Sequence, residues 1–351
     1  MSSLLSKIAL TIAVSSSMLL AACGSSQQES GPATVTLLTH DSFVVSQVLI
    51  DQLKTDSGIT LKITTAGDAG SMVAGAVLAS GIPNADVMFG IDNTLLTKAV
   101  DAQVFSSFTS KNLDSVIPEL KKDTGNGVVT PIDYGDVCVN IDDAWFTKRK
   151  LAKPTSLDQL TSPAYKDLLV VQDPATSSPG LAFMLATIAK YGDQWGQYWE
   201  KLNQNGVKVS GSWTDAYDSA FSSNGGSYPL VVSYATSPPA EIVYAENPKP
   251  TKPSTSVLTD GCYRQVEFAG VLRGTRNEQA AQQVVDWLLS AGVQADVPLS
   301  MFVFPARANT PLPEVFTKFA AKISQPLQLL ASDVNANLKN WLSEWGQVMG
   351  R

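Results

Sequence analysis

The stretch LLVVQDPATSSPGLAFML, residues 168–185, decides which fold we expect for this chain. It begins with an apolar run typical of a buried strand, continues through a loop of small hydroxyl-bearing residues, and ends in an apolar helical segment. Ser178 is expected to cap that helix and Pro179 to be its first residue, because proline lacks an N–H that the first turn leaves unpaired. Such a loop, at a helix N-terminus, also suits an anion. By itself the stretch favours the architectural role.

The same strand–loop–helix order recurs along the chain. Strand-like runs are expected at 34–39, 61–66 and 85–90, with helical runs at 43–55 and 68–80 between them. A second series contains strands ending near Trp213 and Tyr234, a long strand at 263–274, and a helical tail from Pro311. This alternation predicts an α/β fold with a mostly parallel sheet covered by helices on both faces.

In sheets of this kind, ligands bind beyond the carboxyl ends of the strands. Three polar clusters stand at such ends, and Asp68 and Ser71 in the second of them are expected to open a helix. The residues of the three clusters that we take as candidate ligand contacts are His40, Asp41, Asp68, Ala69, Ser71, Asp92 and Asn93.

Two aromatic residues join these candidates. Trp213 lies among small residues that open a helix, and Tyr234 ends an apolar strand before another hydroxyl-rich loop. Core packing is the alternative for such side chains, above all for Tyr217 and Phe304. Flat aromatic faces beside carboxylates and loop amides suit a flat, cationic heterocycle.

Composition limits the classes of partner. The 351 residues carry a formal net charge of −7 and are 44% hydrophobic and 16% charged. A chain this acidic offers no basic surface for phosphates, so nucleic acid is not an expected partner. Its length is sufficient for two domains.

The N-terminal segment is expected to be an export signal. Residues 1–22 combine Lys7 with a short apolar run, and LAAC ends in Cys23, which resembles the lipobox of bacterial lipoproteins. We therefore expect a signal peptide over 1–22 and a lipidated tether over 23–33, with a cleaved soluble signal as the alternative. The protein would then work outside the cytoplasm, anchored to the cell membrane by lipid.

Three cysteines are present, and lipidation would use Cys23. Cys138 and Cys262 remain, and an even remainder in an oxidising compartment predicts a disulfide, with two separate buried thiols as the alternative.

No catalytic motif was found. The chain contains no nucleophile elbow, P-loop, HExxH, dinucleotide-binding GxGxxG or CxxC pattern. His40 is the single histidine, so any Ser-His-Asp site would have to be built around it. We expect a binding protein with no catalytic residue and no metal site; a surface-anchored hydrolase is the alternative from a different class.

Several motifs together resemble the periplasmic thiamine-binding proteins of ABC importers. They are THDSF, GIDNTLL, PIDYGD, QDPATSSPGL, SWTDAY, VVSYATSPPA and WLSEW, which occur in the family's order from about residue 35 onward. The resemblance implies a type II solute-binding fold, in which two α/β lobes joined by two crossing strands enclose a ligand cleft. Lobe 1 is expected at 34–134 and 266–312, and lobe 2 at 135–265 and 313–351. The crossing strands, near 133–140 and 263–268, would bring Cys138 and Cys262 close together.

The resemblance also implies the ligand and its contacts. The ligand would be thiamine, thiamine monophosphate or thiamine diphosphate, delivered by a monomer to an ABC permease, with no cofactor. The family's contacts fall on Asp68, Ala69, Ser177, Trp213 and Tyr234, and Ser237 and Phe302 complete the expected set. The loop at 176–180 would receive the phosphate arm or the hydroxyethyl group.

Two positions depart from the family pattern. His40 replaces a tyrosine, and Phe302 replaces a tryptophan, which leaves the preference among thiamine forms open. In the same fold, a receptor for a polyamine or ferric ion is the alternative, although iron receptors use an adjacent tyrosine pair that this chain lacks.

Overall fold

The computed structural model describes residues 33–351 except 123 and 126. The predicted signal peptide, Cys23 and nearly all of the tether lie outside the described residues. Within the described part, no helix is long and apolar enough to cross a membrane.

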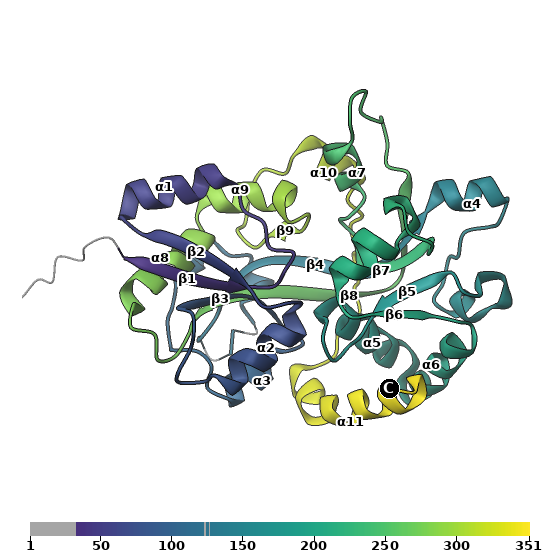
Figure 1. Ribbon diagram of the computed structural model, residues 1–351, viewed down its shortest axis with the longest axis horizontal. Helices are drawn as coiled ribbons and strands as arrows, with labels where there is room; N and C mark the ends of the chain where they lie inside the picture. Colours follow the sequence, from purple (N-terminus) through teal and green to yellow (C-terminus); the bar gives the residue numbers. More distant parts are fainter. Residues whose placement is uncertain (1–32, 123, 126) are drawn as a thin grey trace, which may run out of the picture. The chain divides into compact units, whose positions relative to one another are not determined.

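A single mixed sheet of nine strands organises the described residues, in the order β2-β1-β3-β8-β4-β7-β5-β6, with β9 beside β4. Figure 1 shows three strands at one end of the sheet, three at the other, and two long strands running between them. The first end holds β1 (Thr34–Thr39), β2 (Thr60–Thr65) and β3 (Val87–Asp92). The other end holds β5 (Leu169–Gln172), β6 (Lys208–Ser210) and β7 (Leu230–Tyr234). The long strands are β4 (Thr130–Asp142) and β8 (Thr255–Val271), and β9 is Phe304–Pro305.

The expected strands and the α/β class are confirmed, but the sheet is parallel only toward its ends. β1 pairs in parallel with β2 and β3, and β5 pairs in parallel with β6 and β7. The central pairs β3–β8, β8–β4 and β4–β7 are antiparallel. Parallel neighbours require a crossover connection, whereas β4 and β8 pass directly from one end to the other in opposite directions. We call the two ends the first half and the second half.

Helices cover both halves of the sheet. Those of the first half are α1 (Gln47–Ser57), α2 (Ala69–Leu78), α3 (Leu96–Asp101), α8 (Glu278–Leu288) and α9 (Ala291–Ser300). Those of the second half are α4 (Asp143–Arg149), α5 (Ser178–Tyr191), α6 (Trp195–Gln204), α7 (Pro239–Tyr244), α10 (Glu314–Phe319) and α11 (Ala331–Met349). Short 3-10 turns and a π-helical segment at Asp215–Ala220 complete the structure. Helix α5 is the central one, because every residue from Ser178 to Ile188 is buried.

Two predicted helix starts were wrong by small shifts. Helix α1 begins at Gln47, not Phe43, because the backbone N–H of Ser46 donates to Asp296 on α9 at 2.9 Å and so holds the preceding segment extended. Helix α5 begins at Ser178, so that Ser177 is the N-cap residue, and no described side chain caps this helix.

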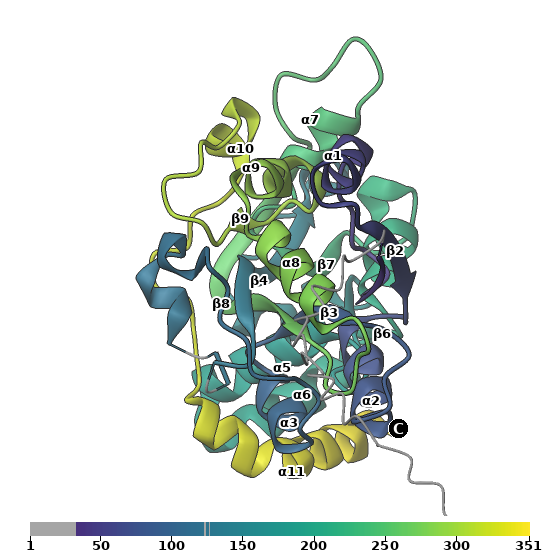
Figure 2. The same ribbon diagram turned by 90° about the vertical axis from the view of Figure 1, so that its left-hand side faces the viewer.

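The C-terminal tail is not one helix. The segment between α10 and α11 is extended, and Leu327 exchanges backbone hydrogen bonds with Cys262 and Arg264 of β8. Pairing with this strand therefore replaces the helix there. Helix α11 then lies beside α6 and α3 (Figure 2), with Trp345 buried edge-on against Trp199 at 5.6 Å.

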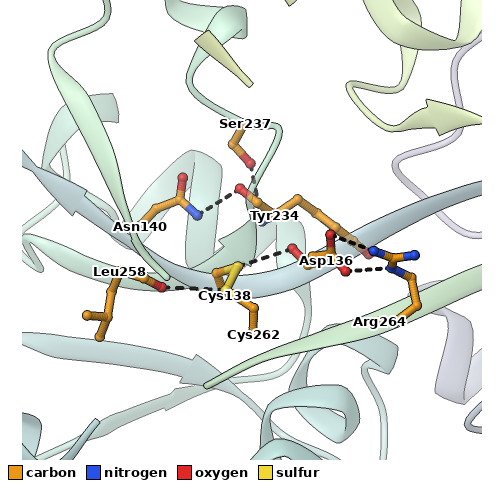
Figure 3. The surroundings of a disulfide bond; sticks show 8 residues. All are labelled: Asp136, Cys138, Asn140, Tyr234, Ser237, Leu258, Cys262 and Arg264. Carbon is orange, nitrogen blue, oxygen red and sulfur yellow. Dashed lines mark hydrogen bonds and ion pairs between the residues drawn. A yellow bond between two sulfur atoms is a disulfide. The ribbon is translucent and has the colours of Figure 1, made fainter. Parts of the chain in front are cut away.

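A disulfide joins the two long strands. Cys138 of β4 and Cys262 of β8 are bonded, with a Cα–Cα distance of 4.5 Å (Figure 3). Two residues along each strand, Arg264 forms a bidentate ion pair with Asp136 at 2.6 and 3.2 Å. The structure thus pairs the two cysteines as expected and adds an ion pair between the same strands.

The disulfide closes a loop of 124 residues. In the chain-entropy treatment, such a cross-link stabilises the folded state by about 4–5 kcal/mol. We expect the double variant Cys138→Ala/Cys262→Ala to lose free energy of unfolding on this scale in urea titrations of the mature chain. Equal stability of the variant and the oxidised wild type, or two free thiols found by alkylation of the unreduced protein, would contradict the prediction.

Candidate functional site

Three buried carboxylates lie in a row across the centre of the sheet. Glu267 of β8 is the register partner of Asp92 on β3 and of Asp133 on β4. Directly opposite residues of antiparallel strands place their side chains on the same face, so the three carboxylates are neighbours. All three are at most 8% exposed. We call Asp92, Glu267 and Asp133 the carboxylate row.

Tyr234 lies next to this row on the same face. Its ring packs on Gly135, two residues beyond Asp133, where a Cβ atom would come within 2.9 Å of the ring. Any residue with a Cβ atom at this position would therefore force the Tyr234 ring to move. The Tyr234 hydroxyl donates to Gln265 at 3.0 Å, and Gln265 in turn donates to Ser178 on α5.

His40 is the basic side chain of the site. Its Nε2 atom lies 3.5 Å from Glu267, and its Nδ1 atom hydrogen-bonds Ser42 at 2.9 Å. Among the described residues, no other basic side chain forms an ion pair with the carboxylate row or with Asp68. The ring is 6% exposed and tilted against Phe89.

Asp68 connects the two halves. It is the N-cap of α2 and accepts the backbone N–H of Ala69 at 2.6 Å. Its other oxygen accepts the backbone N–H of Trp213, in the second half, at 2.8 Å. The Trp213 indole stacks on Tyr217 at 4.9 Å and donates to Ser233 at 3.0 Å, and Ser233 hydrogen-bonds Ser237. One carboxylate therefore fixes both a helix start and an aromatic ring.

The first turn of α2 touches the loop after β5. The backbone N–H of Ser71 donates to the carbonyl of Thr176 at 3.1 Å, and a Cβ atom on Gly70 would come within 2.6 Å of the Thr176 backbone. The next residue, Ser177, is fully buried, and its hydroxyl has no hydrogen-bond partner among the described residues. This loop is therefore a contact surface between the two halves as well as the entrance to α5.

The remaining predicted residues are spread more widely. Asp41 and Ser71 have exposed side chains. Asn93 uses its amide on the backbone of β8, accepting from Val266 at 2.8 Å. Phe302, at a φ of 53°, contacts Tyr244 of the second half at 5.5 Å. Nothing in the structure tests whether these side chains contact a ligand, so their role stays a prediction.

The carboxyl groups of the site resist ionisation because they are buried. Burial raises the pKa of Asp92 to about 6, against hydrogen bonds from Thr94. Burial and the neighbouring charge of Glu267 raise the pKa of Asp133 well above its usual value. Burial also raises the pKa of Asp68, although the adjacent hydroxyl of Ser177 and the N–H groups of Trp213 and Ala69 oppose it.

His40 and Glu267 form the ion pair that compensates part of this charge. Burial alone would lower the pKa of His40, but Glu267, with smaller effects of Asp68 and Asp41, raises it. Burial alone would raise the pKa of Glu267, but the charge of His40, with hydrogen bonds from His40 and Asp133, lowers it.

Sequence reasoning missed three members of this site: Asp133, Gln265 and Glu267. Asp133 precedes Gly135 in PIDYGD, and Gln265 and Glu267 alternate with apolar residues in YRQVEFAGV. Polar residues at every second position of a buried strand share a face, and that signal would have identified Gln265 and Glu267. Only the register of β4 against β8 brings Asp133 to them.

The arrangement suits a flat organic cation. It combines aromatic rings with four buried carboxyl groups and one histidine, so an added positive charge is stabilised electrostatically. Among the described residues, no group of His, Cys, Asp and Glu is arranged to hold a metal ion.

This chain is similar to known proteins in sequence and in fold. The family model described as bacterial extracellular solute-binding protein matches residues 83–321. The thiamine-binding periplasmic protein of Escherichia coli K12 is 29% identical over 322 residues, which cover 90% of this chain and 94% of the relative. A solved periplasmic thiamin binding protein superposes with a TM-score of 0.79 at 29% identity, covering 91% of this chain and 96% of that one. A ferric binding protein from Campylobacter jejuni, at 18% identity and a TM-score of 0.71 over 90% of this chain and 99% of that one, shares the fold.

The contact between α2 and the loop after β5 predicts the effect of a small substitution. Gly70→Ala is expected to force the two halves apart, because the added methyl group meets the Thr176 backbone. Gly75→Ala is the matched control, since Gly75 lies in the same helix and no described atom outside that helix comes within 4 Å of its Cβ position. Alanine should stabilise the helix by up to about 1 kcal/mol at both positions.

Small-angle X-ray scattering measures the difference. Gly70→Ala should increase the radius of gyration of the mature protein, whereas Gly75→Ala should leave it at the wild-type value. Identical scattering from both variants would show that the contact does not hold the halves together.

The His40–Glu267 ion pair predicts a pH dependence of stability. His40 has a raised pKa, so its contribution is fully present below 6.5 and is lost as pH rises through the raised value. Glu267 has a lowered pKa, so its contribution is present above 4.5 and is lost as pH falls below that. The stability advantage of the wild type over His40→Gln should therefore be largest between these values and decline as pH rises through the raised pKa of His40. Urea unfolding of both proteins across this range provides the measurement, and a pH-independent difference would contradict the pairing.

Proposed function

This chain belongs to the family of bacterial extracellular solute-binding proteins, and we propose that it captures thiamine or its phosphates outside the cytoplasm and delivers them to an ABC permease. The observation that carries the proposal is that the aromatic ring of Tyr234 lies beside buried carboxyl groups. Only one basic side chain, His40, forms an ion pair with these groups among the described residues. Thiamine presents a flat aminopyrimidine and a thiazolium ring with a permanent positive charge. The names of the E. coli relative and of the superposed structure, both thiamine-binding, support this ligand.

We propose that the contact residues bind different parts of the ligand. The rings of Trp213 and Tyr234 would face the ligand's rings, and Asp68 would provide negative charge between them, since it already lies against Trp213. The buried hydroxyl of Ser177 makes no hydrogen bond within the described part of the chain, and it would bind the hydroxyethyl or phosphate arm. The complete proposed set is His40, Asp41, Asp68, Ala69, Ser71, Asp92, Asn93, Ser177, Trp213, Tyr234, Ser237 and Phe302.

The site supports binding rather than catalysis. His40 hydrogen-bonds Ser42, but its other nitrogen faces Glu267 in a buried ion pair, so it is not arranged as a base beside an accessible nucleophile. We therefore propose a monomeric binding protein that needs no cofactor, with lobes at 34–134 plus 266–312 and 135–265 plus 313–351. Lipidation of Cys23 would anchor it at the outer face of the cell membrane.

A ferric-ion receptor of the same fold is less well supported. The ferric binding protein from C. jejuni matches at 18% identity, which establishes only the shared architecture. Iron requires oxygen or nitrogen ligands converging on one point, and the described residues contain no such group of His, Cys, Asp and Glu. Binding of Fe³⁺ by the mature protein, with no binding of thiamine, would favour this alternative.

Removal of the Trp213 indole tests the proposal. Trp213→Ala should cost about 2–3 kcal/mol of binding free energy, because apolar contact and cation–π attraction are both lost. This corresponds to a roughly 30- to 150-fold higher Kd for thiamine in calorimetric titration.

Trp145→Ala is the control, because this half-buried tryptophan lies on α4 under Arg149, away from the site. It should retain the wild-type Kd. A folded Trp213→Ala variant with unchanged affinity would remove Trp213 from the site. Absence of binding of thiamine, thiamine monophosphate and thiamine diphosphate by the wild type would overturn the proposed function.

A further inference from the structure

Asp133 is the buried group of the site whose environment is least complete. Its side chain is 1% exposed, and neither carboxylate oxygen accepts a hydrogen bond from a described residue. The small cavity that it lines, between Phe43 and Val297, has a volume of about 10 Å³. This is space for one water molecule at most, so solvation cannot replace the missing donors. An ionised carboxylate in such a place is costly unless a cation approaches it.

Glu267 is the nearest partner of Asp133. The two residues are directly opposite in the β4–β8 register, and antiparallel register partners have their side chains in contact range. Two adjacent carboxyl groups in a low-dielectric environment do not both ionise readily, and one proton shared between them relieves the repulsion. The raised pKa of Asp133 and the lowered pKa of Glu267 are consistent with a proton residing mainly on Asp133.

The other charged groups around this pair do not remove the excess negative charge. They are Asp92 from β3, His40 from the segment after β1, Asp68 from α2, Tyr234 from β7 and Asp296 from α9. His40 compensates one charge only. Arg264, the neighbouring basic residue of β8, points to the opposite face, where it pairs with Asp136.

Tyr234 lies between the Asp133–Glu267 pair and the proposed position of the ligand. It packs on Gly135, on the same face as Asp133, and its own pKa is raised by burial and by the charges of Glu267, Asp68, Asp92 and Asp133. A cation lying on this ring is therefore within the field of the carboxyl pair.

We propose that Asp133 and Glu267 share one proton in the ligand-free protein and release it to solvent when a permanently cationic ligand binds. The pair thereby selects for positive charge without contacting the ligand. This inference rests on the proposed function and deepens it. The step is balanced: one O–H bond of a carboxyl breaks, the proton passes to buffer, and the ligand's fixed charge compensates the carboxylate that remains.

Proton release is measured by calorimetry. Thiamine is titrated into the mature wild-type protein at pH about 7 in phosphate and in Tris, whose ionisation enthalpies differ. We expect a buffer-dependent heat that corresponds to release of up to about one proton, and a Kd that rises at most about tenfold for each unit by which pH falls. Binding of thiamine with the same heat in both buffers would overturn the inference while leaving the proposed function intact. No binding in either buffer would overturn the proposed function instead.

The variant Asp133→Asn tests whether the released proton comes from the Asp133–Glu267 pair or from another acidic residue. The amide can donate to Glu267, so this variant should fold with a urea midpoint at or above that of the wild type at pH about 8. The Asp133→Asn variant should release no proton when thiamine binds. The comparison ligand is an analogue in which a neutral thiophene replaces the thiazolium ring. The preference for thiamine over this analogue should fall by roughly tenfold, as expected for one charge acting over about 10 Å in a partly polar medium.

Asp51→Asn is the matched control. Asp51 is exposed on α1, so the same Asp-to-Asn substitution is made there without altering the carboxylate row. The Asp51→Asn variant should keep the wild-type preference for thiamine over the thiophene analogue and the wild-type proton release. A wild-type preference in a folded Asp133→Asn variant, or an equal loss of preference in Asp51→Asn, would show that the pair does not select for charge.

Discussion

The antiparallel pairing of β4 with β8 is the constraint on which the rest of the structure depends. These are the strands that carry the sheet from the first half to the second, and their register aligns Asp133 with Glu267. A disulfide and the Arg264–Asp136 ion pair join the same strands near their middle. Because side chains in a strand alternate between faces, a shift by one residue would move the carboxyl groups away from Tyr234. Fold and site are therefore fixed by one register.

The buried carboxyl groups of the site oppose folding but favour the binding of a cation. Burial of Asp68, Asp92, Asp133 and Glu267 is unfavourable for folding, and His40 offsets only part of this cost. A protein built only for stability would be expected to replace such groups by apolar residues of similar volume. Their presence beside an aromatic surface is the pattern expected where function opposes stability, since a bound cation supplies the missing charge. The remainder of the sheet and helix α5 provide the apolar core that compensates.

Beside the site, backbone groups and one carboxylate make contacts between the two halves. Ser71 and Thr176 meet through N–H and C=O groups, and Asp68 accepts the N–H of Trp213. These contacts are short and directional, so they align the two halves at the site.

The sequence by itself determined the α/β class, most strands, the start of α2 at Asp68, and a set of polar residues at strand ends, because these depend on local periodicity and capping. It did not determine the start of α1 or the break after α10, since Ser46 is held by Asp296 and Leu327 by β8, both far away in the chain. The alternation of Gln265 and Glu267 with apolar residues does predict that these two side chains share one face of the strand. The role of Asp133 was not, because a lone aspartate becomes part of a site only when the register of two distant strands brings it beside a second carboxyl group. Tertiary structure alone decided that, through burial and the repulsion of like charges.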